Sequence, residues 1–149
     1  RSARISITSN DGHDLIGCTI TGGAQNINIY NETITFTSGT SATTISGLPA
    51  GTYTMHEVTP PTGYQVATDI TFTVGADGTI TGSEVTAATA TNNAVVTMLD
   101  APAVVDISKV AVGGGSELPG AELELTCSGV DLTAVEVSGG AQDVVKTAN

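Results

Sequence analysis

The sequence has no tryptophan and few other aromatic residues, with Phe and Tyr together making up 3% of its 149 residues. No stretch shows a convincing helical period, and no apolar run is long enough to cross a bilayer. The remainder is dominated by Thr, Ser, Val, Ile and Gly, a composition that favours short strands joined by tight turns. We therefore expect an all-β protein with no membrane insertion.

Basic residues are also scarce, since 15 acidic residues face only four basic ones and the formal net charge is -11. Arg1, Arg4, Lys109 and Lys146 cannot form the basic patch that a nucleic-acid binder needs to neutralise phosphates. The same negative charge is repelled by anionic membranes. The sequence therefore excludes nucleic acid as a partner.

The two cysteines, Cys18 and Cys127, are too few for a disulfide framework and are not spaced as metal ligands. We expect two small buried side chains, and a bridge between modules or between chains stays open. Neither a signal peptide nor a sortase-type anchoring signal is found, so for a secreted protein we expect this sequence to be a mature or excised segment.

Motifs for metals, cofactors and metabolic catalysis are lacking as well. The segment Asn10–Asp14 lacks the full ligand ladder of a calcium loop, so we interpret it as a hairpin turn. His13 and His56 are isolated, and no nucleophile elbow or aromatic sugar platform is evident. We expect no metal, no cofactor and no enzyme activity.

Two parts of the chain repeat one another in the same order. Arg4–Ile7 is echoed by Asp106–Lys109, and Gly22–Gln25 is echoed by Gly139–Gln142. This predicts one complete module over residues 2–102 and the N-terminal part of a second over 103–149. A part of a module cannot bury a sheet face alone, so the second is either truncated or completed by another chain.

Within the first module, alternating or β-branched residues predict antiparallel strands that form a β-sandwich of the immunoglobulin-like kind. The strands are expected at Arg4–Thr8, Glu32–Thr37, Gly51–Val58, Asp69–Val74, Thr79–Thr81 and Ala94–Leu99. Turn residues separate them at Asn10–Gly12, Ser38–Gly39, Leu48–Gly51, Pro60–Gly63 and Ala76–Gly78.

Three ionisable residues follow apolar residues on one face of a predicted strand: Glu57, Asp100 and Lys109. A charge buried without a partner is costly, so such groups are normally neutralised, paired or functional. A lysine in apolar surroundings loses its proton more easily and becomes a nucleophile, while a carboxylic acid stays protonated. Held together, an amine and a carboxyl group can form an amide with loss of water.

The segment Gly51-Thr-Tyr-Thr-Met-His-Glu-Val-Thr-Pro-Pro-Thr-Gly-Tyr64 resembles the GxYxxxExxxPxGY signature of Cna B-type domains, also called prealbumin-like or SpaA-like. The family's next strand resembles Asp69–Val74, and its last strand resembles Val95–Pro102. Its opening strand, with the ELPGA turn, resembles Ile107–Ala121. The resemblance implies a prealbumin-like stalk module of a Gram-positive pilin or adhesin, located outside the cell at the cell wall. It also implies an isopeptide bond between Lys109 and Asp100, with Glu57 as proton relay.

This sequence departs from the family pattern, because Ile7 stands where the first strand of the module should carry the lysine. Two explanations stay open. Either the first module has lost its bond and Lys109 belongs to a module cut short, or Lys109 of one chain bonds to Asp100 of the next. The expected partners are other copies or neighbouring modules. The alternative is an adhesive module that recognises a host glycan or protein through its loops.

Overall fold

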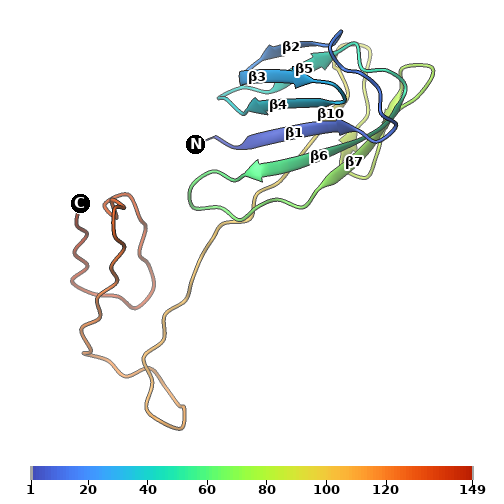
Figure 1. Ribbon diagram of the computed structural model, residues 1–149. Helices are drawn as coiled ribbons and strands as arrows, with labels where there is room; N and C mark the ends of the chain where they lie inside the picture. Colours follow the sequence, from blue (N-terminus) through green and yellow to red (C-terminus); the bar gives the residue numbers. More distant parts are fainter. Residues whose placement is uncertain (1, 149) are drawn as a thin grey trace. The chain divides into compact units, whose positions relative to one another are not determined.

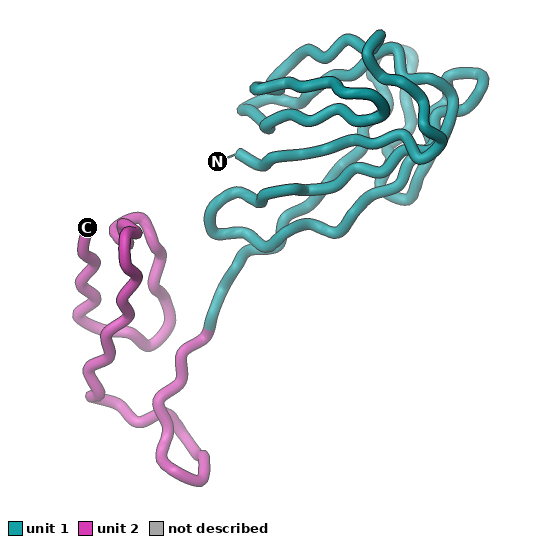
Figure 2. The backbone as a smooth tube through the Cα atoms, viewed as in Figure 1, with its two compact units in different colours: residues 1–105 teal, residues 106–149 magenta. Residues whose placement is uncertain are grey.

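The computed structural model describes residues 2–148 (Figure 1). The chain forms two compact units, whose boundary falls between Val105 and Asp106 (Figure 2). Every strand of the described residues lies in the first unit. This boundary lies three residues after the predicted one, and the assignment of the second unit to another module stays a prediction. No helix of residues 2–148 has the length and apolarity to span a bilayer.

The first unit is an all-β sandwich, as predicted, with one large sheet and two small ones. The large sheet has the strand order β3-β4-β1-β6-β7-β8, and every pairing in it is antiparallel (Figure 1). Its strands are β1 Arg4–Ser9, β3 Gln25–Tyr30, β4 Thr33–Thr37, β6 Gly51–Thr59, β7 Ile70–Val74 and β8 Ile80–Thr81. The small sheets pair β2 Thr19–Gly22 with β5 Thr43–Ser46, and β9 Val85–Thr86 with β10 Val95–Val96.

Alternation along the strands of the large sheet creates its core face, because successive side chains of a strand point to opposite faces. In β1 the side chains of Ile5 and Ile7 are buried, while Ser6 and Thr8 between them are half-buried on the other face. The small sheets supply the apolar residues that pack against this core, including Ile20, Ile45, Val85 and Val96. The core is therefore closed between the large sheet and the two small ones.

Tyr53 on β6 is fully buried at the centre of this core. Its ring stacks on Phe72 of β7 with 5.5 Å between centroids, and its hydroxyl donates a 2.6 Å hydrogen bond to the carbonyl oxygen of Pro49. A buried tyrosine needs such a partner for its hydroxyl group. Burial, together with the nearby Cys18 and Asp11, raises the pKa of Tyr53.

The strand predictions hold for β1, β4, β6, β7 and β8, each of which differs from its predicted range by one residue at one end. The last predicted strand, Ala94–Leu99, is too long, because only Val95–Val96 pairs with a neighbour. Four strands were not predicted, namely β2, β3, β5 and β9. They are short, or exposed and polar like β3, so they lack the buried alternation that marks the others.

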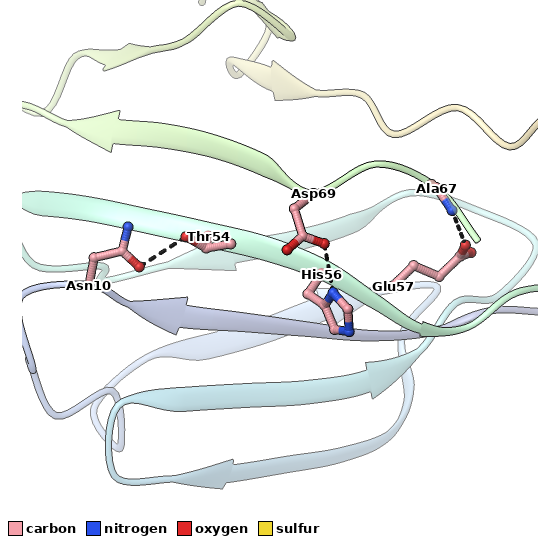
Figure 3. Close-up of polar contacts among 6 residues, drawn as sticks. All are labelled: Asn10, Thr54, His56, Glu57, Ala67 and Asp69. Atoms are coloured by element: carbon pink, nitrogen blue, oxygen red, sulfur yellow. Dashed lines mark hydrogen bonds and ion pairs between the residues drawn. The ribbon is translucent and has the colours of Figure 1, made fainter.

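The turn predicted in Asn10–Asp14 is present, with a 3.4 Å hydrogen bond from the Gly12 amide to the Ser9 carbonyl oxygen. It does not form a hairpin, because the strand that follows, β2, pairs with β5 and not with β1. Side chains of this segment instead hold it against β6. Asp11 Oδ2 accepts a 2.7 Å hydrogen bond from the Thr52 amide, and Asn10 Oδ1 accepts a 2.9 Å bond from the Thr54 hydroxyl (Figure 3). The side chains of these polar turn residues therefore hold the loop after β1 against β6.

The opening strands expected for a second module are not formed, since the described part of the second unit contains only an isolated bridge between Val110 and Glu117. The Glu117 carboxylate accepts hydrogen bonds from the Ser108 hydroxyl and the Lys109 amide, which lower the pKa of Glu117. The repeated glycines also differ between the units. A Cβ on Gly22 would collide with the Ala42 carbonyl oxygen, whereas one on its counterpart Gly139 would meet open space.

Neighbouring residues Leu15 and Ile16 provide a matched test of this core. Leu15 is fully buried, so Leu15→Ala should lower the free energy of unfolding by about 2–5 kcal/mol. Ile16 is 68% exposed, so Ile16→Ala should change it by less than about 0.5 kcal/mol. Urea unfolding of both variants measures the difference. Equal losses of unfolding free energy would contradict the packing described above.

The two thiols should differ in reactivity. Both are free; Cys18 is buried as expected, whereas Cys127 is exposed, so the prediction of burial is wrong for Cys127. Burial also raises the pKa of Cys18, which lowers its thiolate fraction. Ellman's reagent should therefore titrate Cys127 in the native protein and Cys18 only after denaturation. A native protein in which neither thiol reacts until reductant is added would point to a disulfide instead.

Candidate functional site

Glu57 is a carboxyl group in the apolar face of the large sheet. It follows Tyr53 and Met55 on the inner face of β6, as predicted, and is only 1% exposed. Its Oε2 atom accepts a 2.7 Å hydrogen bond from the amide of Ala67, in the connection between β6 and β7 (Figure 3). Its Oε1 atom is buried and has no hydrogen-bond partner in the described protein.

The strand beside Glu57 offers no amine to pair with it. The register of β1 against β6 places Ile5 directly opposite Glu57, and Ile7 opposite Met55. The prediction identified Ile7 as the residue in the lysine position, whereas the direct neighbour across the strands is Ile5. Both side chains are buried and apolar, so the first strand leaves the carboxyl group without a cation.

Asp100 lies just beyond β10, where Val96 and Met98 are partly buried against the core. Its side chain is half-buried, so the predicted inward direction holds only in part. The residues after it dock on the connection between β6 and β7. Ala101 accepts a 2.8 Å backbone hydrogen bond from Gln65, and Ala103 donates a 2.9 Å bond to Gly63.

Glu57 and the segment that follows Asp100 therefore hold the same connection between β6 and β7. Glu57 holds it at Ala67, and residues 101–103 hold it at residues 63–65. The backbone of residues 63–67 therefore contacts both the Glu57 side chain and the segment that directly follows Asp100.

The inward direction predicted for Lys109 is wrong, since Lys109, Val105 and Ile107 are all exposed. The physical reason is that this segment forms no strand and has no facing layer to pack against. Within residues 2–148, the Lys109 amino group makes no hydrogen bond or ion pair, whereas Lys146 donates a 3.0 Å hydrogen bond to the carbonyl oxygen of Val135. Lys109 therefore carries a free amine on an exposed segment.

His56 faces outward from β6, as its position in the strand predicts. Its Nδ1 atom lies 2.6 Å from Asp69 Oδ1, and the two side chains are 49% and 55% exposed (Figure 3). An exposed pair of this kind contributes at most about 1 kcal/mol to stability. No His, Cys, Asp and Glu side chains of the described chain cluster in a way that could hold a metal ion.

A buried carboxyl group with one unsatisfied oxygen is suited to proton transfer. Oε2 is held by a backbone amide, so the free Oε1 is the atom that can receive a proton from a neighbouring amine or return one to a leaving group. The apolar residues around it keep water away from the carboxyl group. The arrangement can assist amide formation once an amine is placed beside it.

The role of Glu57 as a hydrogen-bond acceptor can be tested by two substitutions. Glu57→Gln keeps an oxygen for the Ala67 amide and nearly the same volume. Glu57→Ala leaves the buried Ala67 amide without a hydrogen-bond acceptor. This loss alone should lower the free energy of unfolding by roughly 1–3 kcal/mol. Thermal and urea unfolding should therefore show the alanine variant to be clearly the less stable of the two. Equal losses would show that the Ala67 bond contributes little.

Comparison with known proteins gives one match. A family model described as the SpaA prealbumin-like fold domain matches residues 2–89, more than half of the chain. No curated protein and no solved structure matches the chain. The matched range contains Glu57 and the strands β1 to β9 of the sandwich. It ends before β10 and before Asp100 and Lys109, the two residues of the predicted cross-link.

Proposed function

Because the chain belongs to the SpaA family of prealbumin-like fold domains, we propose that it is a structural module of a Gram-positive pilus, filament or adhesin stalk, linked through isopeptide chemistry. Domains of this family occur in Gram-positive surface proteins and are structural rather than enzymatic. In the proposed link, Lys109 of one subunit is joined to Asp100 of the next, with Glu57 as the proton relay.

The observation that carries the proposal is the unsatisfied Oε1 atom of Glu57. An unpaired polar atom in an apolar core lowers stability, and its position is explained if an amine enters from outside the module. Ile5 and Ile7 rule out a lysine on the neighbouring strand of the same module.

The proposed reaction forms one amide bond. The neutral amine of Lys109 attacks the carboxyl carbon of Asp100, so that a C–N bond forms and a C–OH bond breaks. Glu57 takes the proton that the amine loses and delivers it to the departing hydroxyl group, which leaves as water. Nothing is oxidised or reduced. Because the product is permanent, each site reacts once, and the module is not an enzyme.

A link between chains is favoured over a link within one chain by the short connection between the two residues. Asp100 and Lys109 are separated by a few residues that include Pro102, and the backbone at 101–103 is already bound to the connection between β6 and β7. This restricts how far Lys109 can turn back towards Asp100 of its own chain. The free amine of Lys109 is instead available to a second copy.

The proposal predicts covalent multimers of the full chain. A boiled, reduced sample should give a ladder on a denaturing gel, and its intact masses should be multiples that are one water lighter at each junction. Lys109→Ala should abolish the ladder. Asp100→Asn should keep the ladder but lose ammonia rather than water at each junction, because the leaving group is then an amide nitrogen.

The matched control is Lys146→Ala, since Lys146 is the only other lysine of the chain and its amine is already bound to a backbone carbonyl. This variant should keep the ladder. A single band at the sequence mass in the unsubstituted protein would refute the covalent link and leave a structural module with an unreacted lysine.

A further inference from the structure

The largest sheet carries a surface hollow at the hairpin between its edge strand β3 and β4. The hollow has a volume of about 270 Å³ and is lined by Asn28, Tyr30, Asn31, Glu32, Thr33 and Thr35. Tyr30 is 72% exposed, whereas Tyr53, Phe36 and Phe72 are buried in the core. The ring of Tyr30 therefore contributes little to the packing of the core and is accessible from solvent.

Most of the polar side chains around this ring are also without partners in the described protein, Thr33 being the exception. Among the described residues, the side chains of Asn28, Asn31, Glu32 and Thr35 make no hydrogen bond to the protein. Asn28 stands opposite Thr35 and Tyr30 opposite Thr33, so these two cross-strand pairs share one face of the sheet. The hollow therefore combines an exposed ring with several free donors and acceptors.

The hairpin is held in place before any ligand binds. The carbonyl oxygen of Asn31 accepts a 2.9 Å hydrogen bond from the amide of the fully buried Leu15, and that of Glu32 accepts a 2.8 Å bond from Ser9. Thr33 and Thr8 are also joined through their hydroxyl groups at 3.1 Å. A site fixed in this way loses little conformational freedom on binding.

We infer that this hollow is a binding site for a neutral saccharide. A pyranose ring presents C–H groups on one face, which pack on an aromatic ring, and hydroxyl groups at its edge, which bond to amide, carboxylate and hydroxyl side chains. The hollow is slightly smaller than the range of about 300–1,000 Å³ typical of pockets for drug-sized molecules, which suits one sugar residue.

The charge of the site selects a neutral sugar. Glu32 contributes a carboxylate to the lining, none of the lining residues is basic, and the whole chain has a net charge of -11. Arg4, the only basic residue of β1, donates side-chain hydrogen bonds to Asn26 and Thr37, neither of which lines the hollow. Acidic sugars are therefore disfavoured by repulsion.

A peptide strand added to the edge of the sheet fits less well. β3 has a register irregularity between Gln25 and Asn28, and Asn26 within it has a φ of 49°. An irregularity of this kind interrupts the row of hydrogen-bonding groups that an added strand requires. The β3 edge therefore disfavours the addition of another strand, while the hairpin between β3 and β4 remains accessible to a small ligand.

The test is a titration of the full chain with methyl glycosides of galactose, glucose, mannose and N-acetylglucosamine, followed by amide chemical shifts. At least one glycoside should bind and shift the amides of Thr33 and Thr35, while the methyl glycoside of N-acetylneuraminic acid, which is acidic, should not. Tyr30→Ala should weaken that binding by about threefold to tenfold, and Tyr30→Phe should retain most of it, because the ring supplies the stacking surface.

Val66→Ala is the control, since Val66 is also exposed but does not line the hollow. This variant should bind the glycoside with the same affinity as the unsubstituted protein. The inference is overturned if no glycoside shifts these amides at tens of millimolar, or if Tyr30→Ala binds as tightly as Tyr30→Phe. The Lys109→Ala chain should give the same titration, so this result is independent of the proposed cross-link.

Discussion

A carboxyl group buried in the apolar face of a sheet sets the main constraint on this module. Glu57 sits among the core residues of β6, and the only hydrogen bond of its side chain within the described protein is the one it accepts from the Ala67 amide. That bond fixes the connection between β6 and β7, on which residues 101–103 also dock. The organisation of this end of the sandwich therefore depends on a group whose second oxygen has no protein partner.

The two units have complementary needs. The sandwich contains the buried carboxyl group and a half-buried Asp100 but no amine nearby, because Ile5 and Ile7 occupy the adjacent strand. The second unit contains the free amine of Lys109 and many exposed apolar side chains, and its described residues form no strand. Apolar residues that alternate without a facing layer gain stability when another surface covers them. Linking of subunits would meet both needs.

Much of the sandwich could be predicted from the sequence, since strands with one buried face carry a clear two-residue alternation. The burial of Tyr53, Met55 and Glu57 was predicted from that alternation alone. β3 could not be predicted, because its exposed polar residues show no such pattern. The exposure of Tyr30 was missed for the same reason. Lys109 was predicted to point inward because Val105 and Ile107 precede it on the same face of a predicted strand, but such a face is buried only when neighbouring strands are present.

The most direct test of the account is whether the amide joins two different chains. Chains labelled with ¹⁵N would be mixed with unlabelled chains before the link forms, then digested and analysed by tandem mass spectrometry. The account predicts a branched peptide that joins Lys109 of a labelled chain to Asp100 of an unlabelled one, together with its converse. If Lys109 and Asp100 are joined only within chains of one label, or are not joined at all, the account of a linked filament is contradicted.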